Sequence, residues 1–89
     1  MPFHFPKTYE SKPFYGDNQK IASATLTYTG TIDQVKFWLG VSDFYDGTYI
    51  YEEVTPSVLH TFTASGKWLK WRALGSNGAL TKIQVVVNT

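Results

Sequence analysis

The feature that most constrains the fold is an alternation of apolar and polar side chains, with a period of two residues, that recurs along most of the chain. In residues 21–28, IASATLTY, alanine, leucine and tyrosine share one face, and serine and threonine share the other. This period is typical of a half-buried β-strand, because successive side chains of a strand point to opposite faces. The sequence therefore predicts strands over residues 21–28 and, by the same alternation, over residues 34–41.

Four further segments are predicted as strands: residues 48–54, 58–63, 67–74 and 80–88. In the segment 48–54, Tyr49 and Tyr51 share a face with Glu53, whereas Ile50 and Val54 share the other with Glu52. The alternation therefore does not decide which face of this strand is buried.

Turn signals separate the predicted strands. The sequence TGTID at residues 29–33, the Asp46-Gly47 pair and the sequence GSNG at residues 75–78 are rich in residues that tolerate turn conformations. Pro56 would interrupt a central strand, because proline has no N–H to donate.

Strands spaced about ten residues apart, with no helical period between them, predict an all-β fold: an antiparallel sandwich or a small barrel. With 89 residues, the chain is long enough for one modest core. We expect a single β-sandwich domain over residues 19–89, made of six or more short strands.

Residues 1–18 are predicted to form an extended N-terminal arm, because three prolines make a regular strand or helix improbable there. The arm carries the rings of Phe3, Phe5, Tyr9, Phe14 and Tyr15. Such rings are costly to leave in water, so we expect them to dock on the domain or on a neighbouring copy. Removal of residues 1–18 is then expected to impair assembly more than folding.

Composition excludes several classes of function. Eight Lys and Arg against seven Asp and Glu give a net charge of +1, too little to attract nucleic acid. The absence of cysteine excludes disulfides, thiolate zinc sites and cysteine nucleophiles. No run approaches 18 apolar residues and no signal-peptide pattern opens the chain, so we expect a soluble protein without a membrane partner.

Catalytic residues are not predicted. The only candidates for a histidine base are His4 and His60, and no GxSxG motif accompanies them. Glu52 and Glu53 are adjacent in a predicted strand, so they point to opposite faces and cannot flank one glycosidic bond. We expect these carboxylates to face solvent or to pair with Lys and Arg, and we expect no enzyme and no cofactor.

The turn that holds Asp43 and Asp46 is a candidate calcium site, because two carboxylates lie near Gly47 there. Aspartates are common in turns simply because they bond to their own backbone. The sequence therefore predicts no metal site.

The fifteen aromatic residues exceed what a core of this size needs, so some are expected at an interface or a ligand site. Leu69, Trp71 and Ala73 are predicted in the core, whereas Trp38 and Trp68 lie opposite the aliphatic rows of their strands. For a protein interface, the candidate residues are Phe3, Phe5, Tyr9, Phe14, Trp38, Trp68, Lys70 and Arg72. For a sugar site, the alternative set is Trp38, Tyr49, Tyr51 and Trp68, with Lys36, Lys70 and Arg72 as hydrogen-bond or cation–π partners.

Residues 52–87, EEVTPSVLHTFTASGKWLKWRALGSNGALTKIQVVV, resemble a motif of structural proteins from tailed bacteriophages and related prokaryotic viruses. The matching residues are Glu53, Val54, Thr55, His60, Thr61, Phe62, Gly66, Leu69, Trp71, Arg72, Ala73, Thr81, Ile83 and Val85. Residues 35–54 look like the preceding hairpin of the same module, although the family often has Trp near the position of Tyr51. The resemblance covers roughly residues 20–88.

The resemblance implies a β-sandwich, often jelly-roll-like, that serves as a non-enzymatic virion component. The module is commonly the C-terminal piece of a longer chain, and the size of this chain, 89 residues, departs from that setting. Two roles therefore stay open: a capsid decoration or cement protein, or a tail or spike component. The implied location is the virion, or the host cytoplasm during assembly. The implied partners are copies of the chain itself, with a trimer the favoured oligomer, and a larger virion protein. The alternative function is a carbohydrate-binding module that recognises host-surface glycans.

Overall fold

The computed structural model of the chain describes residues 3–5 and 7–89, except for the side chains of Phe3, His4 and Ile32. Its strands are β1 (Phe3–His4), β2 (Lys7–Glu10), β3 (Phe14–Tyr15), β4 (Ser23–Ser42), β5 (Ile50–Val54), β6 (His60–Thr61) and β7 (Trp68–Asn88). All seven pair antiparallel in one sheet, so the predicted all-β antiparallel class is confirmed. The described residues form no helix, and therefore none that could cross a bilayer.

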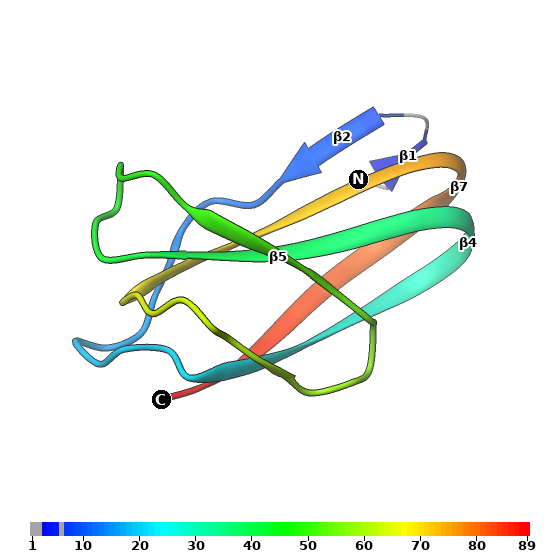
Figure 1. Cartoon of the computed structure of the whole chain (residues 1–89). Helices are drawn as coiled ribbons and strands as arrows, with labels where there is room; N and C mark the ends of the chain where they lie inside the picture. The colour runs from blue at the N-terminus through cyan, green and yellow to red at the C-terminus, as the bar shows by residue number, and fades with distance from the viewer. Residues whose placement is uncertain (1–2, 6) are drawn as a thin grey trace.

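The two long strands β4 and β7 organise the fold. They pair along almost their whole length, from Ser23 opposite Asn88 to Ser42 opposite Trp68. Both strands bend sharply at the same place, on the right-hand side of Figure 1, so that the first half of β4 and the second half of β7 lie below the other halves of these strands. The sheet therefore folds over itself into a nearly closed, barrel-like structure with the core between its two halves.

The prediction that residues 29–33 and 75–78 form turns between separate strands is wrong. These segments lie opposite each other across the β4–β7 pair, with Asp33 facing Asn77, so each is the other's strand partner. Gly30 and Gly78 have positive φ values of 140° and 117°, which favour glycine. A register shift between Thr29 and Gly30 adds a bulge, and bulges bend strands. Turn-forming residues on both strands thus make one shared bend.

The core confirms the predicted alternation. Its buried side chains include Ala24 and Leu26 from the first half of β4, Phe37, Leu39 and Val41 from the second half, and Leu69, Trp71, Ala73 and Leu80 from β7. The predicted core positions of Leu69, Trp71 and Ala73 are therefore correct. In β5, Val54 is buried and Glu52 half-buried, whereas Glu53 is exposed, so the inward row of β5 is the one that ends in Val54.

The N-terminal segment forms strands that the prolines were expected to prevent. β1, β2 and β3 pair in succession with β7, and Pro13 falls between β2 and β3. The segment lies along the edge of β7, as the blue strand above the orange one shows in Figure 1. Because short strands alternate with the interrupting residues, each can still donate its hydrogen bonds to β7.

Two other predicted strands are shorter than expected. The predicted strand 48–54 begins only at Ile50, as β5. Pairing in the predicted strand 58–63 is limited to His60–Thr61, which lie against Ser23 and Ala24 of β4. In the turn before β5, the N–H of Gly47 donates to the carbonyl of Phe44, but neither Asp46 nor Gly47 has a positive φ.

Candidate functional site

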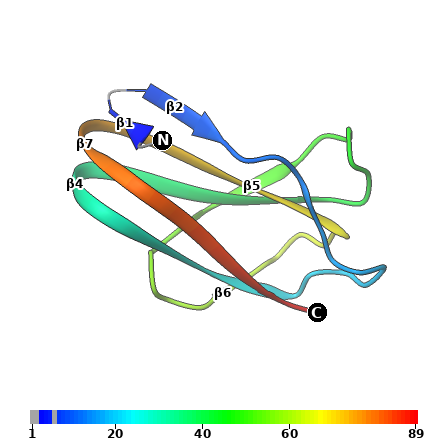
Figure 2. The same ribbon diagram turned by 180° about the vertical axis from the view of Figure 1, so that it is seen from behind.

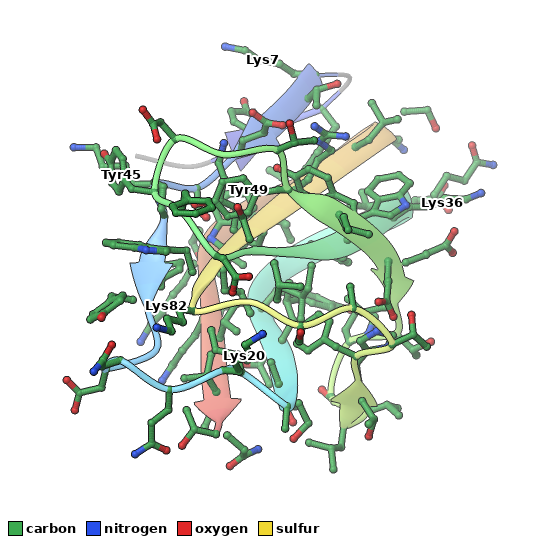
Figure 3. All side chains as sticks on the ribbon, turned by 60° about the vertical axis from the view of Figure 1, so that its left-hand side comes forward. Lys7, Lys20, Lys36, Tyr45, Tyr49 and Lys82 are labelled. Carbon is green, nitrogen blue, oxygen red and sulfur yellow. The ribbon has the colours of Figure 1, made fainter. Side chains whose placement is uncertain are left out.

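One outward surface collects most of the aromatic and charged residues that the sequence singled out. It lies on the half of the sheet formed by β5, the second half of β4, the first half of β7, and β2 and β3. We call it the aromatic face; its residues are Glu10, Tyr15, Lys36, Trp38, Tyr51, Glu53, Trp68, Lys70 and Arg72, joined by Tyr45 and Tyr49 from the loop before β5. Figure 3 shows Tyr45 and Tyr49 on this loop and Lys36 on β4.

Strand alternation explains why these residues share a face. Trp38 lies opposite Arg72 on one side and opposite Glu53 on the other, and Glu10 lies opposite Arg72. Their chain neighbours Phe37, Leu39 and Ala73 point into the core. The same period that buries one row therefore exposes the other.

Arg72 is at the centre of the face. Its Nε and Nη2 atoms donate hydrogen bonds of 2.8 and 2.5 Å to Oε1 of Glu10, and its guanidinium lies 4.0 Å from the centre of the Tyr51 ring. The hydrogen bonds from Arg72, aided by its charge, lower the pKa of Glu10. Burial, and then the negative charge of Glu10, raise the pKa of the Tyr51 hydroxyl. This arrangement joins β2, β7 and β5 across the sheet.

The Tyr51 ring covers Gly40 of β4. A Cβ atom on Gly40 would lie only 2.8 Å from the ring, so glycine is needed for the ring to reach the sheet surface. Tyr51 is therefore held between a glycine below and the Arg72 guanidinium.

Lys70 continues the charged row. Its Nζ lies 3.9 Å from Oε2 of Glu10 and 5.2 Å from the centre of the Tyr49 ring. The Tyr49 hydroxyl donates a 2.8 Å hydrogen bond to the carbonyl of Tyr45. Burial raises the pKa of the Tyr49 hydroxyl. The cations expected to meet a partner thus already contact rings and a carboxylate of their own chain.

Three rings form a separate cluster at one end of the face, which we call the Trp68 corner: Tyr15, Tyr45 and Trp68. The Tyr15 and Trp68 ring centres are 4.6 Å apart, and Tyr45 meets Trp68 edge to face at 5.2 Å. Tyr15 is 48% exposed and Tyr45 57% exposed, and the neighbouring Phe44 is also exposed. This corner presents apolar ring surface from three chain segments to solvent.

The structure places the predicted interface residues in different environments. Phe5 is only 9% exposed and packs edge to face on Tyr9, which lies against the core. A partner could reach the Phe5 ring only if β1 and β2 left the sheet. Phe14 is 46% exposed, and the Phe3 side chain lies outside the described residues. Trp38, Trp68, Lys70 and Arg72 share the aromatic face, half-buried.

The sequence-based prediction missed Glu10 and Tyr45 as residues of this surface, and Phe44 beside it. Glu10 gave no local signal, because its partner Arg72 is 62 positions away. Phe44 and Tyr45 did give one: they are two aromatic residues inside the turn SDFYDG, where polar residues are usual.

Glu52 and His60 form a second polar cluster, on the inward side of β5. Oε1 of Glu52 lies 2.9 Å from Nε2 of His60, and the carboxylate also accepts hydrogen bonds from the N–H groups of Thr63 and Ala64 and from the Thr63 hydroxyl. Burial of the carboxyl acts to raise its pKa, but the hydrogen bonds from Ala64, His60 and Thr63 outweigh it and lower the pKa of Glu52. Glu52 therefore fixes the loop 63–64 instead of pairing with Lys or Arg.

In the turn that is the candidate calcium site, Oδ2 of Asp43 lies 4.0 Å from Lys20 Nζ. Within the described part of the chain, no three His, Cys, Asp or Glu residues gather in a way that could hold a metal ion.

An open pocket of about 720 Å³ adjoins the other end of the aromatic face, where β4 and β7 bend. Its lining residues are Gln34, Val35, Lys36, Leu74, Gly75 and Ser76. A hydrogen bond of 2.8 Å from the Ser76 hydroxyl to Oε1 of Gln34 closes one side. Of the predicted sugar-site partners, only Lys36 reaches this pocket.

Comparisons of the chain with models of protein families, with curated proteins and with solved structures find no match.

Proposed function

We propose that the chain is a non-enzymatic virion structural protein that attaches, through the Trp68 corner, to a larger virion protein or to copies of itself. Within this proposal the bent sheet is a β-sandwich of the jelly-roll-like type, and the chain acts as a capsid decoration protein or as a tail component. The motif in residues 52–87 supports the virion assignment by its resemblance to modules of phage structural proteins.

The observation that carries the proposal is the exposure of the Trp68 corner. Tyrosine and tryptophan dominate the energetics of protein interfaces, because they bury large areas at a small cost in side-chain entropy. Tyr15 and Tyr45 hold Trp68 between them and are themselves about half exposed. A partner would bury ring surface that is already ordered.

Repetition on a particle would strengthen such a contact. A small surface of three rings gives modest affinity alone, but many copies on a symmetric lattice act together, so weak contacts add up to firm attachment.

Co-sedimentation with virus particles tests this function. A tagged chain is produced in infected host cells, and its amount per particle is measured after density-gradient purification. The double variant Tyr45→Ser and Trp68→Ser is expected to reduce that amount at least about tenfold, corresponding to about 1.4 kcal/mol. Leu59→Ser is the matched control, since Leu59 is also 57% exposed but lies outside the corner. A wild-type chain that stays at the top of the gradient contradicts the proposal.

A carbohydrate-binding module is the second candidate, because planar rings on an exposed sheet face can stack on sugars. Arg72 and Lys70 already contact the Tyr51 and Tyr49 rings, so the Trp68 corner offers the more accessible rings. Titration with host-surface polysaccharides, followed by tryptophan fluorescence, separates the two candidates. A saturable response that Trp68→Ser abolishes would favour sugar binding, and no response across the panel would exclude it.

A further inference from the structure

The paired strands β4 and β7 have two outer edges, and each edge has two halves because both strands bend. β5 covers the second half of β4. β6 covers the first half of β4, with additional hydrogen bonds from the N–H of Ser57 to Leu26 and from the N–H of Phe62 to Ala22. β1, β2 and β3 cover the first half of β7 as far as Leu80. Three of the four half-edges therefore carry a neighbouring strand.

The fourth half-edge is formed by residues 81–88 of β7. Among the described residues, this segment pairs only with β4, and no strand lies along its other side. Figure 2 shows this part of β7, orange to red, in front of β4. An open strand edge presents unpaired N–H and C=O groups to any extended chain that approaches.

Burial shows that the core is incomplete at this edge. Val85 and Val87 point inward beside Leu26 and Ala24 of β4, yet they are only partly buried, whereas Leu26 and Ala24 are almost fully buried. Ile83 is also only partly buried. A further strand beside β7 would cover this apolar row.

The sequence of the edge lacks the usual protection. Exposed edge strands commonly carry charges, proline or bulges that prevent pairing with other chains. β5 has two adjacent glutamates, whereas residues 83–88, IQVVVN, contain no charge, proline or glycine. In addition, Val86 points outward and is 55% exposed.

We propose that residues 82–88 of β7 pair antiparallel with the same segment of a second copy, across a two-fold axis at Val85. This register sets Val85 opposite its own counterpart and Ile83 opposite Val87, so apolar side chains meet on the inward face. On the outward face, Gln84 meets Val86, and Lys82 meets Asn88. The pair is a dimer with one continuous sheet, not the trimer expected from the resemblance.

Charge favours an antiparallel pairing of two copies. Lys82 is the only charged residue of the segment, and a parallel pairing in register would set the two lysines side by side. In the antiparallel register, the lysines lie at opposite ends, about 20 Å apart at 3.4 Å per residue. The segment is thus complementary to itself.

Sedimentation velocity of the whole chain at about 1 to 100 µM tests the pairing. The wild type is expected to sediment as a dimer in this range. Val86→Lys places two lysines near each other across the axis and is expected to raise the dimer Kd at least about tenfold. Val58→Lys is the matched control, because Val58 is also 55% exposed but lies in a loop, and its Kd is expected to stay at the wild-type value. A monomeric wild type, a trimer, or a Val86→Lys variant with unchanged Kd overturns the proposal.

Cross-linking tests the register. The chain has no cysteine, so single engineered cysteines report on one position each. Val85→Cys is expected to form a covalent dimer with a short thiol cross-linker, because residues directly opposite have Cβ atoms about 5 Å apart. Lys82→Cys is expected to form no covalent dimer under the same conditions, because its two thiols lie at opposite ends of the paired segments. A Lys82→Cys variant that cross-links as well as Val85→Cys overturns this register. The pairing does not depend on the Trp68 corner, so either proposal can fail without the other.

Discussion

Arg72 on β7 donates two hydrogen bonds to Oε1 of Glu10 on β2, a residue 62 positions earlier in the chain. The same guanidinium lies over the Tyr51 ring, which belongs to β5. The N-terminal segment is therefore attached to the sheet on its outer face as well as through backbone pairing with β7.

Arg72→Lys is expected to reduce stability by only about 0.5 to 1 kcal/mol. Lysine keeps the charge but loses the two-fold hydrogen bonding and the planar contact with Tyr51. The effect is small because the Arg72 and Glu10 side chains are both more than a third exposed, so solvent screens their interaction. Urea unfolding of the two proteins measures the difference, and a loss above about 2 kcal/mol would show that the contact is effectively buried.

Phe5→Ala and Phe14→Ala test which rings of the N-terminal segment belong to the core. Phe5 is 9% exposed, and its truncation is expected to cost about 3 to 5 kcal/mol. Phe14 is 46% exposed, and its truncation is expected to change stability by about 0.5 kcal/mol or less. Equal losses in urea unfolding would contradict the structure. The sequence alone predicts that removal of residues 1–18 impairs assembly more than folding. With Phe5 buried and β2 paired with β7, we expect this removal to impair folding as well.

The strand faces could be predicted from the sequence, whereas the bend that β4 and β7 share could not. Alternation alone identified the inward rows of β4 and β7, because period two follows from strand geometry. The same residues that signal a turn, such as Gly30 and Gly78, also allow a bend in a continuous strand. Only the pairing of residues 29–33 with 77–82 across two strands distinguishes the two outcomes.

Gly30→Ala tests the bend that β4 and β7 share. Gly30 has a φ of 140°, and an added Cβ would lie 2.5 Å from the carbonyl oxygen of Ala79. Backbone strain at this φ is expected to lower the stability of the fold by about 1 to 3 kcal/mol. Thr31→Ala is the control, since Thr31 is exposed and its loss is expected within about 0.5 kcal/mol. Thermal and urea unfolding compare the two variants, and a stable Gly30→Ala variant would show that the bend does not need glycine.

Glu52→Gln tests the hydrogen bonds that hold residues 63–64. The pKa of Glu52 is lowered in the folded chain, so its carboxylate stabilises the fold fully above the ordinary glutamate value of about 4.3. That stabilisation is lost as the pH falls through the lower folded pKa. The stability difference between wild type and Glu52→Gln is therefore expected to be largest at neutral pH and to close in acid. The pKa of Glu10 is also lowered, but Glu10 is present in both proteins, so its contribution cancels in the stability difference. A difference that stays constant with pH would contradict this role.

The candidate site was partly predictable for the same physical reason as the fold. Trp38, Trp68, Lys70 and Arg72 were assigned to outward rows by alternation, and they share one face. The contacts within that face depend on partners far apart in sequence, such as Glu10 for Arg72 and Tyr45 for Trp68. Local patterns carry no information about such pairs.

Oxidative footprinting of the chain on purified virus particles tests the central proposal most directly. The side chains of Tyr15, Tyr45 and Trp68 are labelled in the free chain and in particles, and the degree of oxidation is compared ring by ring. We expect all three rings to be protected in particles, whereas Leu59, exposed in a loop outside the corner, is labelled equally in both states. A chain that is absent from the particles, or equal labelling of the Trp68 corner in both states, would contradict the account.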